Sequence, residues 1–280
     1  MPRRIKLTLE YDGSGFSGWQ TQTGGEPGLE PAEGICTVQG AVERAIRRVT
    51  GTGLRITGAS RTDEGVHAWG QAAHFELPDY SPLGVHQLPL ALNSHLPHGV
   101  RARLAEEVPP EFHAQVSARG KHYRYLIYNA PSFSALLRGT HWHVRFELNL
   151  EAMRQAAQYM VGTHDFTAFA TQLDDIQAKR VEDGKDLLET VRTVSRVDVS
   201  EAPVFAEALG PFPAPRQIAI DVEGVGFLYK MVRTMAGTLM EVGRGKQPPE
   251  WVKLALESKD RSMAGQTAPA QGLCLLKVLY

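Results

Sequence analysis

The sequence is poor in cysteine and has no long apolar run. Its only two cysteines, Cys36 and Cys274, form no CxxC pair. This usage is typical of a reducing compartment and argues against a disulfide framework or a structural zinc site. No stretch approaches the roughly 20 apolar residues that cross a bilayer, and the basic start, Met1–Lys6, leads directly into an alternating pattern rather than a secretory segment. We therefore expect a cytoplasmic protein that does not associate with membranes.

Signatures of metal and nucleotide-cofactor sites are also missing. Ten histidines are present, but none forms an HExxH pair, and no deaminase, P-loop or GxSxG motif occurs. Segment 13–18 fits GxGxxG, yet the residues that follow it cannot begin the helix that a dinucleotide site requires. We interpret this segment as a sharp turn whose glycines let the backbone approach another part of the chain closely. We expect structural or solvated histidines, no metal and no cofactor.

Net charge offers little guidance, since it is −1. Between residues 101 and 145, however, seven Lys or Arg face three acids, and between 147 and 189 nine acids face four bases. A locally basic surface is enough for phosphate contacts. Two ordinary solvated faces explain the pattern as well, and on charge alone we prefer them.

Hydrophobic periodicity predicts the same order of elements, β-α-β-β-α-β, twice. Thr37 is a predicted helix N-cap, and Gly51 is the predicted stop of the same helix. In the first half we expect strands at 5–11, 54–59, 71–77 and 100–108 and helices at 38–49 and 81–92. In the second half we expect strands at 121–129, 191–200, 217–223 and 273–279 and helices at 149–161 and 227–242. The prediction is an α+β protein of two ferredoxin-like halves, 1–109 and 110–280, with largely antiparallel sheets.

Three further segments are predicted to be surface loops inserted into this plan. They span residues 21–34, 171–186 and 202–215 and are rich in glycine, proline or acidic residues. Such loops could clamp a nucleic acid, and simple tolerated insertion is at least as plausible.

The segment Arg61–Ala68, RTDEGVHA, is the strongest candidate for chemistry. It follows a predicted strand and is bounded by Gly58 and Gly65, which predicts a tight loop. Arg61 and Asp63 would share one face in an extended chain, so that the guanidinium keeps the carboxylate ionised and oriented. Such a carboxylate suits attack on a sugar anomeric carbon. A structural Arg–Asp pair that fixes the turn is the commoner alternative.

Two other segments carry candidate binding residues. The strand 121–128 places Tyr123 and Tyr125 on one face and His122 and Arg124 on the other, which suits base stacking and phosphate contact but also plain β-propensity. Arg233 lies roughly 140° around its predicted helix from the apolar Leu228. It is therefore either solvent-exposed or a buried counter-charge for a carboxylate.

Taken together, these segments resemble the tRNA pseudouridine synthase A family nearly from end to end. In the first half the resemblance is carried by 11–13 with Phe16 and 18–20, by 38–39, by 61–63 with 65–68, and by Asn93 with 96–97. In the second half it is carried by 112–114 with 118–119 and 123–125, by 162–166 with Phe169, by Gly224, 226–229 and 231–233, by Gly237 with 242–243, and by 268–270 with 272–273. Ser60, where the family usually has glycine, and the long loop 21–34 depart from the pattern. No single motif is decisive, but so many in one order are very specific.

The resemblance implies two ferredoxin-like halves flanking a central basic cleft, no cofactor, and a homodimer. It implies an isomerase that converts uridine to pseudouridine in the tRNA anticodon arm, at tRNA positions 38 to 40. By resemblance Asp63 is the catalytic nucleophile or base at the ribose. The resemblance gives substrate-binding roles to four further residues. Arg61 would hold the uridine out of the helix, and Arg233 would keep Asp63 charged. Tyr123 would stack on the uracil and help to remove the C5 proton, and Leu273 would pack on the uracil.

Two rival functions stay open at this point. A nucleic-acid N-glycosidase also breaks an N-glycosidic bond with a carboxylate, but it usually needs an activated water and often a second acid. The second rival function is a non-catalytic RNA-binding module with two RRM-like halves, although the spaced aromatic residues of an RNP1 motif are not evident.

Overall fold

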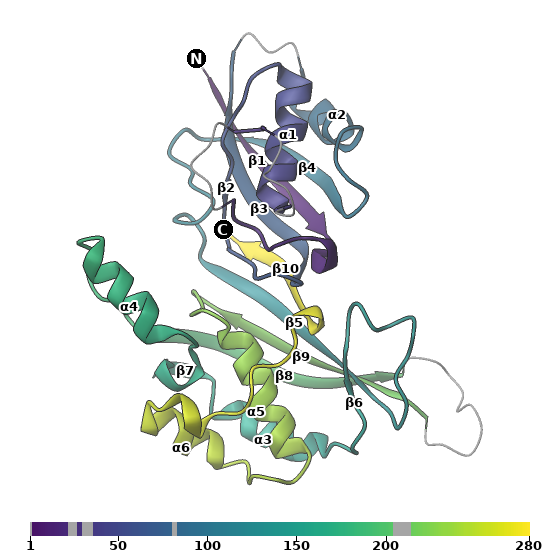
Figure 1. Ribbon diagram of the computed structural model, residues 1–280, viewed down its shortest axis with the longest axis vertical. Coiled ribbons are helices and arrows are strands. Elements are labelled where there is room, and N and C mark those ends of the chain that lie inside the picture. The colour runs from purple at the N-terminus through teal and green to yellow at the C-terminus, as the bar shows by residue number, and fades with distance from the viewer. Residues whose placement is uncertain (1, 22–26, 30–35, 80–82, 204–213) are drawn as a thin grey trace. The chain divides into compact units, whose positions relative to one another are not determined.

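The computed structural model describes residues 2–21, 27–29, 36–79, 83–203 and 214–280. They form two compact units: Met1–Lys121 with Cys274–Tyr280, and His122–Leu273. Each unit combines helices with a mostly antiparallel sheet (Figure 1), and the α+β prediction is confirmed. The predicted halves, 1–109 and 110–280, stay a prediction of domain organisation. The compact units differ from them because residues 110–121 and 274–280 pack with the first unit.

The sheet of the first unit is built on β1 (Arg3–Tyr11). Its antiparallel neighbours are β4 (Val100–Val108) on one edge and β3 (His67–Leu77) on the other. The far edge of β3 carries two short partners: β2 (Thr57–Gly58) is antiparallel to it, and β10 (Leu273–Leu279) is parallel to it through Cys274 and Leu275. With α1 (Val38–Thr50) and α2 (Leu88–Asn93), the order is the predicted β-α-β-β-α-β.

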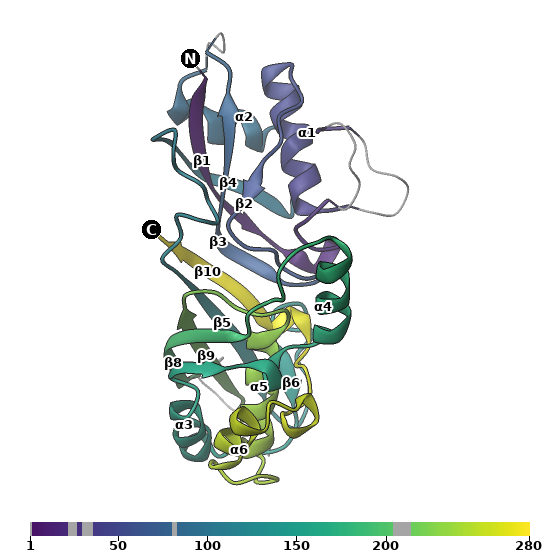
Figure 2. The same cartoon turned by 90° about the vertical axis from the view of Figure 1, so that its left-hand side faces the viewer.

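Helix α1 begins and ends where the sequence predicts. The Thr37 side chain accepts a hydrogen bond from the Gly40 N–H at the N-cap, and Gly51 adopts the left-handed conformation at the C-cap, with φ 75°. Helix α1 covers one face of the first sheet (Figures 1 and 2). The core between them uses the alternate residues of β1, Ile5, Leu7 and Leu9, all fully buried.

Helix α2 is shorter than predicted. The helix expected at 81–92 spans only Leu88–Asn93, preceded by a 3-10 turn at Val85–Gln87, and residues 80–82 lie outside the described ranges. Pro89 explains the late start, because proline is tolerated in the first turn of a helix and not in its interior. The strand expected at 54–59 is likewise confined to Thr57–Gly58.

The second unit repeats the plan with additions, except that the closing strand of the plan, β10, belongs to the first unit from Cys274 onward. Its sheet runs β5 (Gly120–Asn129), β9 (Arg216–Gly224), β8 (Val191–Pro203), β7 (Gly162–Asp165), and β6 (Trp142–Val144) lies parallel to β5. Helix α3 (Leu150–Gln158) packs on α5 (Met231–Gly243) and on β8. The second unit also contains helix α6 (Trp251–Ser258) and 3-10 turns at 167–169, 261–263 and 270–272, and a further 3-10 turn lies at 13–15 in the first unit.

Helix α5 begins four residues later than the predicted 227. Gly226 has φ 127° and Lys230 has φ 58°, so both lie in backbone conformations that an α-helix cannot contain. Arg233 consequently belongs to the first turn of α5 and not to its middle.

The prediction that 171–186 is a loop was wrong, because α4 spans Leu173–Glu182. No residue of this helix is buried, so the apolar stripe that would have revealed it is missing. Asp174 and Asp175 in its first turn and Lys179 and Arg180 in its last turn complement the helix dipole. Most of the loops predicted at 21–34 and 202–215 lies outside the described residues. None of the helices formed by the described residues has the length and apolar character needed to cross a bilayer.

Candidate active site

Asp63 lies in the loop 59–66, which connects β2 to β3 in the first unit. The Val66 N–H donates to the Asp63 carbonyl at 3.1 Å, and Gly65 adopts φ 77°. The predicted tight loop is therefore confirmed. The Asp63 side chain is half-buried within it.

The glycine-rich turn at 13–18 packs directly on this loop. A Cβ atom on Gly13 would lie 2.1 Å from the Val66 carbonyl oxygen, and one on Gly18 would lie 2.9 Å from the Thr62 carbonyl oxygen. The same Thr62 oxygen accepts a hydrogen bond of 3.0 Å from the Trp19 N–H. The close backbone approach predicted for these glycines is confirmed, and what they approach is the Asp63 loop.

Buried side chains fix the loop from below. The Gln71 amide binds both backbone groups of Ser60: its nitrogen donates to the carbonyl at 2.6 Å, and its oxygen accepts from the N–H at 3.2 Å. The hydroxyls of Tyr11 and Thr62 are 2.7 Å apart. The backbone on the N-terminal side of Asp63 is thus clamped, which pre-positions the carboxylate.

Arg61 does not hold Asp63 in the way we expected. Its side chain is exposed, and no ion pair between the two is present in the part of the chain that the structure describes. The two side chains would share a face only in extended chain, whereas this segment turns. Both the expected guanidinium support and the alternative of a structural Arg61–Asp63 pair were wrong.

In the second unit, Tyr123 and Tyr125 share a face of β5, as predicted, but their environments differ. Tyr123 is 6% exposed, and its ring meets the Phe227 ring edge-on, with centroids 5.2 Å apart. Tyr125 is 0% exposed and donates to the Pro269 carbonyl at 2.7 Å. Burial raises the pKa of Tyr125 far above its usual value, although Arg233 acts in the opposite direction. Tyr125 is therefore structural.

On the opposite face of β5, His122 and Arg124 both contact one acidic side chain. Asp221, which is buried, accepts hydrogen bonds from the Arg124 Nε and Nη2 atoms at 3.0 Å each, and His122 Nε2 lies 2.6 Å from Asp221 Oδ1. This bidentate pair neutralises the charge that we had considered for phosphate contact. Phosphate contact by His122 and Arg124 stays a prediction, and in this structure both side chains are paired with Asp221.

Arg233 is half-buried, which favours the second of the two alternatives considered for it. Its Nε donates to the Ala268 carbonyl at 2.8 Å, and the Ala268 N–H donates to the Arg233 carbonyl at 3.1 Å. The same segment continues past Tyr125, whose ring lies against Gly272, to the buried Leu273. Residues 268–273 thus bring together Arg233, Tyr125 and Leu273.

Tyr11 and Gln71 were not predicted to support the site. Both lie on strand faces that point into the core, and Gln71 is fully buried. A polar residue at a core-facing strand position is the signal that could have identified Gln71, because such a group must find hydrogen-bond partners.

The histidines show little sign of metal binding. His67 Nδ1 accepts from the Gly13 N–H at 3.1 Å, and His74 Nδ1 accepts from the Ala114 N–H at 3.2 Å. Across the described ranges, no three His, Cys, Asp or Glu side chains gather where they could hold an ion.

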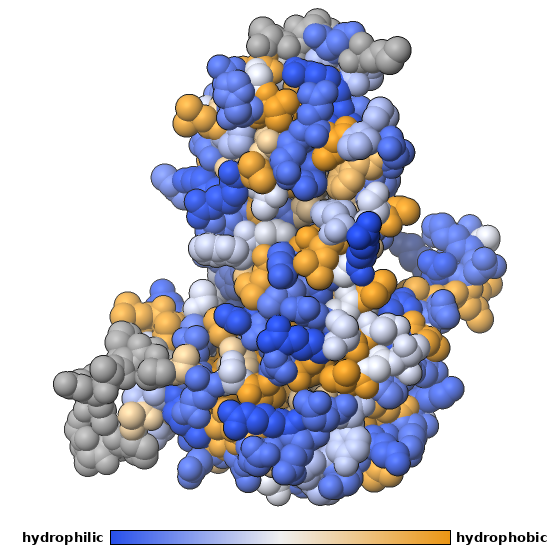
Figure 3. All heavy atoms as spheres, turned by 180° about the vertical axis from the view of Figure 1, so that it is seen from behind, coloured by the Kyte–Doolittle hydropathy of each residue, from blue (hydrophilic) through white to orange (hydrophobic). Residues whose placement is uncertain are grey.

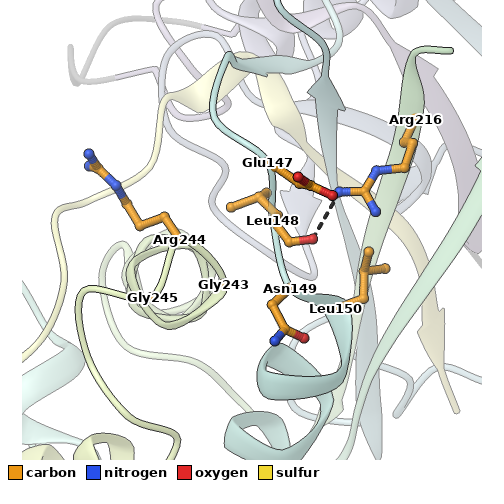
Figure 4. A pocket seen from close by; sticks show the side chains of 8 residues that line it. All are labelled: Glu147, Leu148, Asn149, Leu150, Arg216, Gly243, Arg244 and Gly245. Carbon is orange, nitrogen blue, oxygen red and sulfur yellow. Dashed lines mark hydrogen bonds between the residues drawn. The ribbon is translucent and has the colours of Figure 1, made fainter. Parts of the chain in front are cut away.

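The second unit also contains an open hollow of about 600 Å³. Figure 4 shows its lining, in which Arg216 donates to the Leu148 carbonyl at 2.9 Å. Arg216 also donates to Asn129 at 2.7 Å, so its guanidinium is already occupied. Arg244, at the other side, follows the last residue of α5 and is roughly 16 Å along the helix from Arg233. The lining of the hollow includes none of the predicted site residues of the second unit, Tyr123, Arg233 and Leu273.

Comparison with known proteins agrees with the resemblance. A family model described as tRNA pseudouridine synthase matches residues 156–280. The chain is similar to tRNA pseudouridine synthase A of Ruminiclostridium cellulolyticum, with 41% identity over 278 residues that cover 99% of this chain and 100% of the relative. It is equally similar to tRNA pseudouridine synthase A of Moorella thermoacetica, with 41% identity over 276 residues and 99% of each chain covered. The chain belongs to the tRNA pseudouridine synthase A family, as the sequence motifs predicted.

Proposed function

We propose that this protein is a tRNA pseudouridine synthase, an isomerase that converts uridine in tRNA to pseudouridine. The reaction breaks the bond between N1 of uracil and C1′ of ribose, turns the base, and joins C5 to C1′. The proton on C5 is lost and N1 gains one, so substrate and product have the same atoms. No oxidant, reductant or second substrate is required.

The observation that carries the proposal is the clamped loop that presents Asp63. Its backbone is held by Gly13, Gly18 and Gln71, while its carboxylate remains half-buried. A carboxylate fixed in this way suits either direct attack on C1′ or removal of a ribose proton. We assign Asp63 this role in the chain.

We assign the other site residues to the same uridine. Tyr123 stacks on the uracil and assists removal of the C5 proton, and the buried Leu273 packs against the base. Arg233 supplies the positive charge that keeps Asp63 ionised in a desolvated site. Arg61, which is exposed, contacts the RNA strand and helps to hold the uridine out of the helix, a step that requires a few kcal/mol of unstacking.

We further propose that the substrate is the anticodon arm, at tRNA positions 38 to 40, and that the enzyme acts in the cytoplasm as a homodimer. These assignments rest on the family resemblance.

The test is to incubate the purified protein with unmodified tRNA and to map pseudouridines by chemical labelling. Wild type should modify the anticodon arm, Asp63→Asn should form no pseudouridine while retaining tRNA binding, and Glu64→Gln, the exposed neighbour, should stay active. Full activity in Asp63→Asn would contradict the mechanism. Released uracil would instead indicate an N-glycosidase, and binding without modification would indicate an RNA-binding module.

A further inference from the structure

The first unit leaves a large aromatic side chain in solvent. Trp69 on β3 is 63% exposed, whereas Trp19 beside the Asp63 loop is 2% exposed. On the side opposite α1, shown in Figure 3, hydrophobic side chains are exposed among hydrophilic ones. An indole on a sheet surface presents a flat face that a planar ligand can cover.

Trp69 lies at the edge of a surface hollow of about 510 Å³. The lining crosses the first unit's sheet from β4 through β1 and β3 to β10: Arg103, Thr8, Trp69, Gly70, Ala72, Leu276, Lys277 and Val278. The residues contributed by β1 and β3 next to Trp69 are small. Gly70 cannot be enlarged, because a Cβ atom there would lie 2.4 Å from the Leu276 carbonyl oxygen. Space therefore remains open beside the indole.

The two charged residues that line the hollow, Arg103 and Lys277, are both basic. The Arg103 guanidinium lies 5.8 Å from the centroid of the Trp69 ring and forms an ion pair with Glu10, which together hold the indole in place. Lys277 is exposed and forms no ion pair or hydrogen bond with the described residues. An aromatic face beside an unpaired ammonium is the combination that binds a base together with its phosphate.

The hollow also lies within reach of the catalytic loop. Trp69 lies six positions after Asp63 in the chain, so at full extension the two are at most about 20 Å apart. An RNA strand whose uridine is at Asp63 can therefore place a nearby nucleotide on Trp69.

We propose that Trp69 stacks on a base of the bound tRNA other than the reacting uridine, and that Lys277 contacts a phosphate of that segment. The inference rests on the proposed function and adds a second RNA contact to it. The stacked base does not change during the reaction, so we expect the contact to stabilise the bound tRNA and the transition state equally, and its loss to raise KM more than it lowers kcat.

The test compares full-length wild type with Trp69→Ala and Trp69→Phe, and with Leu90→Ala as control, in tRNA binding at fixed salt and in steady-state kinetics. Leu90 is 80% exposed on α2 and does not line the hollow. Trp69→Ala should weaken tRNA binding by between roughly five-fold and a hundred-fold, the range for loss of one base stack, and should raise KM more than it lowers kcat. Trp69→Phe should recover most of the affinity, and Leu90→Ala should bind like wild type. Lys277→Gln should reduce the slope of log Kd against log salt by about 1.

Unchanged tRNA affinity in a folded Trp69→Ala variant would overturn the inference. So would dissociation of an oligomer by this substitution, measured by sedimentation, with no change in tRNA affinity, because the hollow would then be an interface between copies. Wild type is assayed for pseudouridine in parallel. If wild type forms no pseudouridine, the proposed function is contradicted, while the tRNA affinities of the variants still test the role of Trp69. If wild type is active and Trp69→Ala binds tRNA normally, only the inference about Trp69 is contradicted.

Discussion

Gly18 lies against the backbone of Asp63: a Cβ atom on Gly18 would be 3.3 Å from the Asp63 carbonyl carbon and 3.2 Å from the Glu64 nitrogen. Gly18 also has φ 83°, a backbone conformation that glycine adopts readily and that residues with a side chain adopt only rarely. The position of the candidate catalytic carboxylate therefore depends on the absence of a side chain 45 residues earlier in the chain.

Gly18→Ala should displace the Asp63 loop and lower kcat by roughly a hundred-fold, because a shift of about 1 Å in a reacting group has that effect. Backbone strain should also lower the free energy of unfolding by about 1–3 kcal/mol. Gly15→Ala is the matched control, since Gly15 is in the same turn and has no atom within 4 Å of a built Cβ. Urea unfolding and pseudouridine assays measure both effects, and equal activity of the two variants would contradict the clamp.

The two tyrosines of β5 should separate function from stability. Tyr123→Phe keeps the ring packed on Phe227 but removes the hydroxyl, and we expect pseudouridine formation to fall roughly a hundred-fold, as for loss of a general base, with little change in stability. Tyr125→Phe leaves the Pro269 carbonyl without its donor and should lower the free energy of unfolding by about 1 kcal/mol, with activity largely retained. Loss of activity in Tyr125→Phe with normal activity in Tyr123→Phe would contradict these assignments.

Arg233 and Arg244 lie at opposite ends of α5 and offer a charge-matched comparison. Arg233→Gln should lower kcat roughly a hundred-fold, the effect of losing one preorganised electrostatic contact, while tRNA affinity changes little. Arg244→Gln removes the same charge at the end of the helix distant from Ala268 and should retain kcat. Single-turnover rates with saturating enzyme distinguish the two, and an active Arg233→Gln variant would remove Arg233 from the site.

Asp165 should make stability depend on pH in the acid range. Burial alone would raise its pKa, but hydrogen bonds from Thr167, Thr190 and Lys259 outweigh burial and hold the pKa below its ordinary value. The folded state therefore binds this proton less readily than the unfolded state does. The resulting stability is fully present above about pH 5 and is lost as the pH falls below the usual aspartate pKa of about 3.9, toward the lowered pKa of the folded state.

Asp165→Asn should accordingly lower the free energy of unfolding by about 1 kcal/mol at pH 7, and its difference from wild type should shrink below about pH 4. Asp183→Asn is a control, since this exposed carboxylate pairs only with the neighbouring Lys185 among the described residues. Urea unfolding across the pH range measures the difference, and a pH-independent gap would show that the charge is not responsible.

Local pattern was sufficient where one segment determines its own conformation. Thr37 and Gly51 marked the two ends of α1, alternation marked β1, β4 and β5, and the many short motifs, taken in order, identified the family. Helix α4 escaped prediction because a helix with no buried face has no apolar period, and α5 was predicted too long because the sequence does not reveal that Lys230 adopts a left-handed conformation.

By itself, the sequence determined the α+β class, the repeated β-α-β-β-α-β order, the family and the candidate carboxylate, because these depend on periodicity and on motifs read within short segments. Only the tertiary structure decided how Asp63 is supported. It replaced the expected Arg61 with Gly13, Gly18 and Gln71, and it paired Arg124 with the buried Asp221. The reason is physical: these contacts join residues far apart in the chain, and packing and hydrogen-bond satisfaction in the folded state select the partners.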